Sequence, residues 1–532
     1  MLFNSFTFIL LFLPIVLVGF YLISRLGRSY GAAWLILASF TFYAIWNLRF
    51  VTLLVLSIAF NFGMGEAIHA AEARPTRQKL LLVLGVGCNL LVLFYYKYLF
   101  SLMGFAASFG ITHLRLASIV LPLGISFFTF TQIGYLADMQ QGVVNERGPL
   151  NYILFVTFFP HLIAGPILHN REIMPQFAKP DTYRFSIDNL TAGIVIFIIG
   201  LAKKCILADP IAAHVQAGFA ATSHAPFFAA WFTIFSFNLQ LYFDFSGYTD
   251  MAIGIARMFN VRFPINFNSP FKAASIIDFW HRWHMTLSRF LNLYLFNPIA
   301  LAVIRSRSRR GKPVNRTAQK TPAGFFSMVA MPLLITMGLA GAWHGAGLQF
   351  LIFGLLHGIY LSCNHAWRML HPAGVDHPSR LGTACSFLLT QGAVLVALVF
   401  FRTPDMSTGL QLLGGMFGMH GFDWPSLSSS MLTQADIYHM RGEPAALAYG
   451  KMLKATAQHV VGTAWFVLLC IIVWAAPNTS EIMARYDAAT EVARQATPGW
   501  RPTFGWAAAM GAVGAIALLG VTGTTEFLYY QF

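Results

Sequence analysis

The chain has 532 residues, of which 57% are hydrophobic and only 10% are charged, and its formal net charge is +15. So few charged residues exclude a soluble globular protein of this length, because about a quarter of the residues in such proteins are charged. The positive charge does not indicate nucleic acid as a partner. The basic residues concentrate in short connectors between apolar runs, as they do in the cytoplasmic loops of membrane proteins.

Apolar runs recur along the whole sequence, and most approach the length of about 20 residues that crosses a bilayer as a helix. In chain order they cover residues 6–23, 31–48, 50–65, 80–100, 117–137, 150–168, 187–207, 227–245, 323–342, 347–363, 383–401, 461–476 and 504–521. Gly or Pro interrupts several of them, so we expect some to be re-entrant. The sequence predicts an all-α integral membrane protein with about 11–13 transmembrane or re-entrant helices, in one domain that covers residues 1–532.

Basic residues cluster in the connectors 25–28, 74–79 and Arg305–Lys320, and the last of these has seven Lys or Arg and no acid. The positive-inside rule places these connectors in the cytoplasm and the N-terminus outside. The longest polar connector, 402–459, has room for short interfacial helices, and 476–506 is a second polar connector.

The stretch DFWHRWHMTLSR, Asp278–Arg289, is unusually polar for this chain. On one continuous helix its charged residues, histidines and serine would fall within an arc of roughly 160°, with Phe, Trp and Leu opposite. Arginine and aspartate are too costly to face lipid, so we expect this arc to line a protein interior, a water-filled cavity or the head-group zone. An amphipathic helix in the membrane interface is the alternative. The pair His281 and His284 favours a functional role, because histidine exchanges protons near neutral pH.

A His-x-x-His pair is also compatible with a metal site of the kind found in membrane di-iron oxygenases. Such a site needs several histidine clusters on neighbouring helices, and here only one cluster is tightly spaced and no Glu accompanies it. The five cysteines are scattered without CxxC spacing, so they indicate neither a disulfide framework nor a thiolate metal site. We therefore expect no metal site.

Two more histidines, His344 and His357, lie in the almost uncharged stretch Gly341–Gly358. We interpret His357 as a core residue with a satisfied hydrogen bond. Glycines at 341, 345 and 347 allow another chain or a substrate to approach the backbone around His344 closely. A histidine in a low-dielectric site tends to stay neutral, which is the form a general base needs. The simplest chemistry for it is removal of a proton from a hydroxyl that attacks an activated acyl group.

Several motifs resemble those of the bacterial membrane-bound O-acyltransferases (MBOAT), and especially their alginate O-acetyltransferase-like branch. The motifs are Leu121–Phe130, Phe159–Ile167, Tyr242–Gly254, Asp278–Arg289, Trp343–Gly347, Pro477–Asn478 and Phe527–Phe532. The resemblance implies a helical fold around a central tunnel in the bacterial inner membrane. It also implies that an acyl thioester is used from the cytoplasm and that the acyl group is delivered to the far side.

By the same resemblance, His344 takes the position of the family's catalytic histidine and His284 that of the second functional histidine. His281 stands where relatives often have Arg or Asn, and His161 where they tend to have Gln, which we interpret as a structural replacement. Relatives also carry an Arg-Asp pair within the segment that is Asn292–Pro298 here, so contacts with the donor are expected to differ. Two intramembrane acids, Asp244 and Asp250, are functional candidates or structural partners of arginines.

The sequence thus predicts an inner-membrane O-acyltransferase without a bound cofactor. It would move an acetyl group from acetyl-CoA or an acyl carrier to hydroxyls of an exported polysaccharide or of a periplasmic acceptor protein. His344 would be the general base, and His284 would position or polarise the donor. The alternatives are D-alanyl transfer to teichoic-acid-type polymers and, from another class, a transporter or flippase for lipid-linked sugars. A transporter gives no reason for the glycine-flanked His344.

Overall fold

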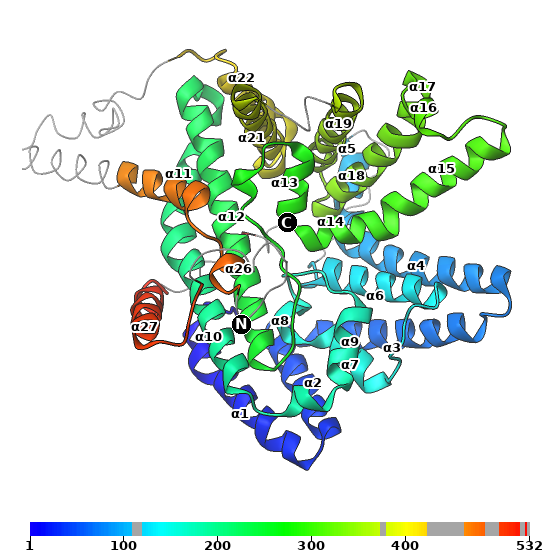
Figure 1. Ribbon diagram of the computed structural model, residues 1–532, viewed down its shortest axis with the longest axis vertical. Coiled ribbons are helices and arrows are strands. Elements are labelled where there is room, and N and C mark those ends of the chain that lie inside the picture. Colours follow the sequence, from blue (N-terminus) through cyan, green and yellow to red (C-terminus); the bar gives the residue numbers. More distant parts are fainter. Residues whose placement is uncertain (109–119, 373–378, 423–461, 485–498, 522–526, 529–532) are drawn as a thin grey trace, which may run out of the picture.

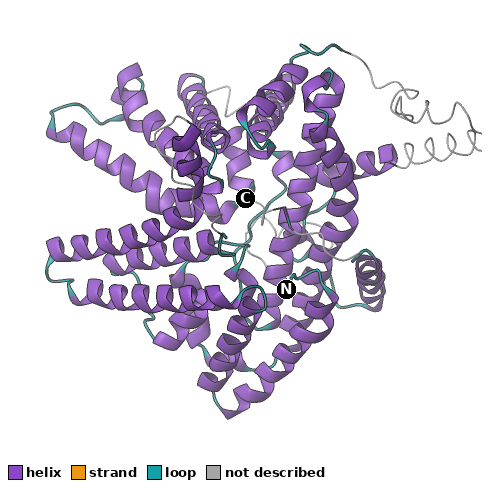
Figure 2. Ribbon diagram, turned by 180° about the vertical axis from the view of Figure 1, so that it is seen from behind, coloured by secondary structure: helices purple, strands orange, loops and turns teal. Residues whose placement is uncertain are grey.

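The computed structural model describes residues 1–108, 120–372, 379–422, 462–484, 499–521 and 527–528. Across these residues the regular structure is helical, and no β-strand occurs among them (Figures 1 and 2). The protein is therefore an all-α membrane protein, as predicted. Of the connector 402–459, the described part contains one helix, Met406–Met416, and residues 423–459 lie outside the described ranges.

Many of the helices described by the structure are joined by short connections. The helices are α1 (Leu13–Ile23), α2 (Arg28–Ala44), α3 (Leu48–Ala70), α4 (Pro75–Lys97), α5 (Leu99–Ser108), α6 (Ile125–Gln140), α7 (Pro149–Thr157), α8 (Phe159–Leu162), α9 (Asn170–Ala178), α10 (Ile187–Ala202), α11 (Asp209–Ala220), α12 (Phe227–Met258), α13 (Ile276–Arg282), α14 (Met285–Leu291), α15 (Asn297–Arg309), α16 (Arg316–Gln319), α17 (Pro322–Phe325), α18 (Met331–His344), α19 (Leu348–Leu370), α21 (Arg380–Arg402), α22 (Met406–Met416), α26 (Thr479–Ile482) and α27 (Phe504–Leu519). Residues 259–275 form a longer connection between α12 and α13. π-helical turns join α10 to α11, α14 to α15 and α17 to α18 into longer continuous helices.

Seven continuous helices among the described residues are long and apolar enough to cross a membrane. They are Thr7–Leu26, Leu48–Ala70, Pro75–Lys97, Ile187–Ala220, Met285–Arg309, Pro322–His344 and Arg380–Arg402. Six coincide with predicted runs. The helix Met285–Arg309 was not predicted, because Arg289, Asn292 and Asn297 interrupt its apolar residues. The run predicted over 150–168 is instead divided into α7 and α8, and residues 158–162 are all buried.

The longest helix, α12, has 32 residues and lies largely buried in the molecule. It packs closely against α10, beside which it runs in both views (Figures 1 and 2). Glycines permit this contact: a Cβ at Gly193 would lie 2.6 Å from the backbone oxygen of Gly254, and one at Gly247 would lie 2.8 Å from that of Gly200. We call this contact the α10–α12 seam.

Two further helix pairs position the candidate site. In the first pair, α3 and α4, the amide groups of Asn61 and Asn89 exchange hydrogen bonds, and α4 ends at Lys97. In the second pair, α18 and α19, a Cβ at Gly341 would lie 2.8 Å from Cα of Gly354. The expected close approach at Gly341 is thus made by the backbone of α19.

Candidate active site

The stretch Asp278–Arg289 does not form one continuous helix. The helix α13 ends at Arg282, Trp283 is extended, and α14 begins at Met285. Between them His284 has a φ of 44° and a ψ of 52°, in the left-handed region, which costs free energy for any residue except Gly. The expectation of a single polar arc along this stretch is therefore wrong.

The side chain and backbone of Asn266 stabilise the break at His284. Its backbone oxygen accepts a hydrogen bond from the backbone N–H of Met285 at 2.9 Å. Its Oδ1 accepts from the backbone N–H and the hydroxyl of Thr286, at 3.2 and 2.8 Å. The same Oδ1 lies 3.1 Å from Nδ1 of His284. Because an amide oxygen only accepts hydrogen bonds, Nδ1 carries the proton and Nε2 is the basic nitrogen of His284.

The helix break separates the side chains that were expected to share one face. His284 is buried, whereas His281 is exposed, so the His-x-x-His pair does not converge on one point. Arg282 forms an ion pair of 2.8 Å with Asp278. Arg289 binds Glu172 of α9 through two hydrogen bonds of 2.7 and 2.9 Å. Both arginines are thus neutralised by carboxylates, and among the charged residues and histidines of the stretch His284 is the buried one.

The second candidate, His344, is the last residue of α18 and is buried. Its ring makes edge-to-face contacts with Phe353 of α19 and Phe401 of α21. Helices leave their last carbonyl groups without partners inside the helix. Here Lys97 Nζ donates hydrogen bonds to the carbonyl oxygens of Trp343 and His344, and the Tyr98 hydroxyl donates to that of Ala342 at 2.8 Å. The end of α4 therefore caps the end of α18.

A cavity of about 110 Å³ borders His344 and Lys97. It is lined also by Trp46, Leu121–Phe127, Ile163 and Trp343. Gly124 in this wall has a φ of 74°, and a Cβ there would lie 2.6 Å from the carbonyl oxygen of Leu162, so only glycine fits. We call this space the His344 cavity.

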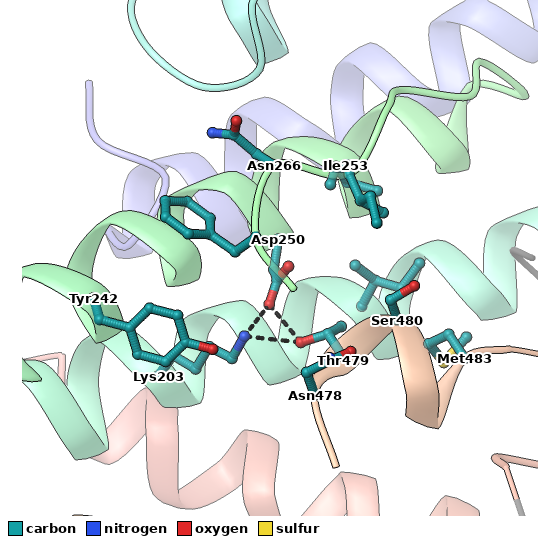
Figure 3. Close-up of a pocket in the computed structure, with 12 residues that line it drawn as sticks. Lys203, Tyr242, Asp250, Ile253, Asn266, Asn478, Thr479, Ser480 and Met483 are labelled. Atoms are coloured by element: carbon teal, nitrogen blue, oxygen red, sulfur yellow. Dashed lines mark hydrogen bonds and ion pairs between the residues drawn. The ribbon is translucent and has the colours of Figure 1, made fainter. Parts of the chain in front are cut away.

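A second cavity lies on the side of Asn266, the residue that binds His284 (Figure 3). Asp250 Oδ2 accepts hydrogen bonds of 2.6 Å from both Lys203 Nζ and the Thr479 hydroxyl. The remaining lining residues are Ile196, Tyr242, Ile253, Ile265, Phe267, Asn478, Ser480 and Met483. We call this space the Asn266 cavity. The motif Pro477–Asn478 contributes to its wall.

The acids Asp244 and Asp250 pair with lysines, not with arginines as expected. Lys203 binds Asp250 at 2.6 Å, and Lys204 binds Asp244 at 2.7 Å. Both lysines lie in the run 187–207, which was predicted only as an apolar span. Because these pairs join α12 to the end of α10, they have a structural role in the α10–α12 seam.

The two candidate histidines are both buried and lie near each other. A stack of aromatic rings joins the elements that carry them: Phe130 of α6 stacks on Trp343 at 4.9 Å and on Phe290 of α14 at 4.8 Å, between ring centroids. The indole N–H of Trp280 donates to Nδ1 of His357 at 3.3 Å, which gives His357 the satisfied hydrogen bond expected of a core residue.

Both candidate histidines lie at helix ends far from the basic connector Arg305–Lys320. The helix Met285–Arg309 begins directly after His284, and Pro322–His344 ends at His344. These helices measure about 35 Å at 1.5 Å per residue, and α15 and α18 both run from the α16–α17 end toward the centre (Figure 1). A membrane-length helix therefore separates each of the two histidines from this connector along the chain.

A polar network beside the site was not predicted. The hydroxyl of Tyr294 donates to Oδ1 of Asp138 at 2.9 Å, and the Asn170 amide donates to Oδ2 at 3.1 Å. His169 Nδ1 lies 3.1 Å from the same hydroxyl. Burial and the charges of Arg289 and Arg171 lower the pKa of His169 to about 3, so this ring is neutral near pH 7. A further histidine, His161, donates through Nε2 to the carbonyl oxygen of Phe155 at 2.7 Å, which fits the structural role expected of it.

Fold and site together define an all-α membrane protein in which two buried histidines from separate motifs lie near each other beside two cavities. The model of the MBOAT, membrane-bound O-acyltransferase family matches residues 144–315. The chain is 39% identical to the peptidoglycan O-acetyltransferase of Helicobacter pylori, over 80% of this chain and 82% of the relative. It is 34% identical to the probable alginate O-acetylase of Pseudomonas aeruginosa, over 81% of this chain and 78% of the relative. A shorter match, 32% identical over 45% of this chain, is to the teichoic acid D-alanyltransferase of Bacillus subtilis, of which it covers 58%.

The chain belongs to the membrane-bound O-acyltransferase family, in its alginate O-acetyltransferase-like branch, and it is an O-acyltransferase. The predicted family and enzyme class are confirmed. Family membership decides against the alternative of a transporter or flippase.

Proposed function

We propose that the protein transfers an acetyl group from a cytoplasmic thioester to hydroxyls of an exported polysaccharide or a periplasmic acceptor protein. The thioester is acetyl-CoA or an acyl carrier, and the membrane is the bacterial inner membrane. Two similar proteins are named for the O-acetylation of peptidoglycan and of alginate, which are both polymers with free hydroxyls. The observation that carries the proposal is the meeting of buried His284 and His344 beside two cavities.

In this mechanism His344 is the general base. It takes the proton from the acceptor hydroxyl as the hydroxyl oxygen attacks the carbonyl carbon of the thioester. The carbonyl π electrons move to the carbonyl oxygen and form a tetrahedral oxyanion. When the intermediate collapses, the C–S bond breaks, the ester forms, and the imidazolium of His344 returns the proton to the departing thiolate. Such proton transfers contribute roughly 10²–10⁴-fold to rates.

His284 has a different part in the mechanism. Asn266 holds the proton on its Nδ1, so Nε2 offers a lone pair to the site. A lone pair cannot donate a hydrogen bond to the thioester carbonyl, so neutral His284 does not polarise it. Instead, Nε2 accepts a hydrogen bond from an N–H of the donor and thereby positions the thioester. Of the two roles expected from the sequence, the geometry favours positioning.

The direction of transfer rests on charge and distance. The basic connector Arg305–Lys320 marks the cytoplasmic side. A helix about 35 Å long separates each of the two histidines from this connector. The acyl group therefore has to pass inward from the cytoplasmic side before it reaches His344. The His344 cavity, at the end of α18 farthest from the connector, is where the acceptor hydroxyl would enter.

The test compares His344→Ala, His284→Ala and His281→Ala in cells that depend on this protein for acetylation. The ester-bound acetate of the peptidoglycan and of exported polysaccharide is released with mild alkali and divided by the amount of the variant in the membrane. We expect a loss of about 100-fold or more for His344→Ala, at the scale of a general base, and a smaller loss for His284→Ala. The exposed His281→Ala is the matched control and should keep full acetylation.

The proposal is wrong if His344→Ala keeps full acetylation. Release of D-alanine instead of acetate would assign the chain to the teichoic-acid type of reaction. Which of the two polymers loses acetate identifies the acceptor, and the higher identity to the peptidoglycan enzyme leads us to expect peptidoglycan.

A further inference from the structure

One charged group in the candidate site has no part in the mechanism so far. Lys97 is the last residue of the membrane-length helix α4, and it lines the His344 cavity. Its Nζ donates hydrogen bonds to the carbonyl oxygens of Trp343 and His344, from 246 and 247 residues away in the sequence. Its ammonium also lies 5.8 Å from the centre of the Trp343 ring.

Lys97 is half-buried, and its surroundings differ from those of Lys203 and Lys204. The ion pairs found among the described residues do not include it, and both of its hydrogen-bond acceptors are neutral carbonyls. An ionisable group inside a membrane protein is costly and usually functional. The partial negative charge at the C-terminus of α18 offsets part of this cost.

Capping α18 does not by itself require a charge. The neighbouring carbonyl of Ala342 is bound by the neutral hydroxyl of Tyr98, so an uncharged donor satisfies this helix end. An ammonium group has three N–H donors, and the two carbonyls occupy two of them. The third N–H is left for a group in the His344 cavity.

We propose that Lys97 is a catalytic residue that stabilises the oxyanion of the transfer step; this inference rests on the proposed function of the His344 site. As the acceptor oxygen bonds to the acyl carbon, the carbonyl π electrons move to the acyl oxygen. The third N–H of Lys97 donates to that oxygen while His344 holds the hydroxyl proton. On collapse the electrons return to the C=O bond, the C–S bond breaks, and the thiolate takes the proton from His344.

The two carbonyl hydrogen bonds explain how Lys97 would be prepared for this role. They tie its ammonium to the same helix end that carries His344, so the base and the oxyanion donor keep a fixed relative position. Preorganised donors of this kind are among the largest contributions to catalysis, and the loss of one costs roughly 10²–10³-fold in rate. A flexible lysine would lose much of that benefit.

The experiment uses the full-length chain in cells, with acetate per sugar normalised to folded protein in the membrane. Folding is checked by a monodisperse elution peak and by thermal unfolding in detergent. The variants are Lys97→Met, which removes all donors; Lys97→Gln, which keeps neutral donors; and Lys97→Arg, which keeps a cation. Tyr98→Phe is the matched control, because it removes a hydrogen bond from the same helix end without removing a charge.

We expect Lys97→Met to lose about 100-fold or more in acetylation per folded copy. Lys97→Gln should stay close to Lys97→Met, Lys97→Arg should recover at least about tenfold, and Tyr98→Phe should stay within about threefold of the unchanged protein. The inference is overturned if Lys97→Gln restores full acetylation, since capping alone would then explain Lys97. It is equally overturned if Lys97→Arg is no better than Lys97→Met.

The same series separates this inference from the proposed function. If His344→Ala keeps full acetylation, the proposed site is wrong, and the proposed catalytic role of Lys97 is wrong as well. If His344→Ala abolishes acetylation while Lys97→Met keeps it within about threefold, the site stands and only the role of Lys97 is wrong.

Discussion

The lysines at the α10–α12 seam and the lysine at the end of α4 have different partners. At the α10–α12 seam, Lys203 and Lys204 bind Asp250 and Asp244. At the end of α4, Lys97 binds only backbone carbonyls among the described residues. A buried charge that is paired with an opposite charge can be explained by structure alone. A charge that the protein keeps beside a histidine and a cavity without such a pair calls for a functional explanation.

The largest effect on stability is expected where the paired lysines are most buried. Lys204→Met should destabilise the protein by about 3–5 kcal/mol, because it leaves the buried carboxylate of Asp244 without its cation. Thermal unfolding in detergent and the amount of folded protein measure this loss. Acetylation per folded copy should stay near the normal level, in contrast to Lys97→Met.

The matched variant for this prediction replaces both partners, Lys204→Met together with Asp244→Leu. The double variant has no uncompensated carboxylate at position 244, but Asp209, whose carboxylate lies 2.8 Å from Lys204 Nζ, still loses its cation, so only part of the lost stability should return. Equal stability of the single and double variants would contradict the view that charge pairing holds the seam. A strong loss of acetylation per folded copy in Lys204→Met would erase the distinction between the two groups of lysines.

A smaller effect is expected from the glycines of the same seam. Gly247→Ala places a Cβ 2.8 Å from the backbone oxygen of Gly200, so α10 and α12 have to move apart. Overpacking of this kind costs about 1–3 kcal/mol. Gly87→Ala in α4 is the control, since nothing lies within 4 Å of a Cβ there, and it should be neutral or slightly stabilising. A thermal shift of equal size in both variants would show that the seam tolerates a wider spacing.

The membrane class and most spans could be predicted because burial in lipid requires long apolar runs, and these are visible locally in the sequence. The family also followed from short motifs, and the same motifs made His284 and His344 the candidate site residues. The helix Met285–Arg309 was not predicted, because it contains polar residues. These residues have protein partners, such as Glu172 for Arg289, and the spacing of residues in the sequence does not reveal such partners. A run of residues predicts a helix, but it does not say which neighbours make a polar side chain tolerable.

The geometry of the site depends on contacts between distant parts of the chain. The break at His284 depends on Asn266, and a regular helix was the natural expectation without that partner. The contact of Lys97 with the backbone of His344 joins residues 247 positions apart. No role was predicted for Lys203 and Lys204, because the other residues of the run 187–207 are mostly apolar. In each case the missing information was a tertiary partner.

The smallest effect is expected for the partly exposed ion pair of the stretch Asp278–Arg289. Arg282 and Asp278 lie one helical turn apart in α13, and their side chains are 31% and 34% exposed. Such pairs contribute about 0.3–0.5 kcal/mol, so Arg282→Gln should leave thermal unfolding almost unchanged.

Arg289→Gln is the informative comparison, because Arg289 joins α14 to Glu172 of α9 through two hydrogen bonds. A larger thermal shift for Arg289→Gln is the expected result, since charged hydrogen bonds between helices exceed those within a helical turn. If Arg282→Gln shifts unfolding more, the charge at α13 supports the break before His284 and belongs with the site.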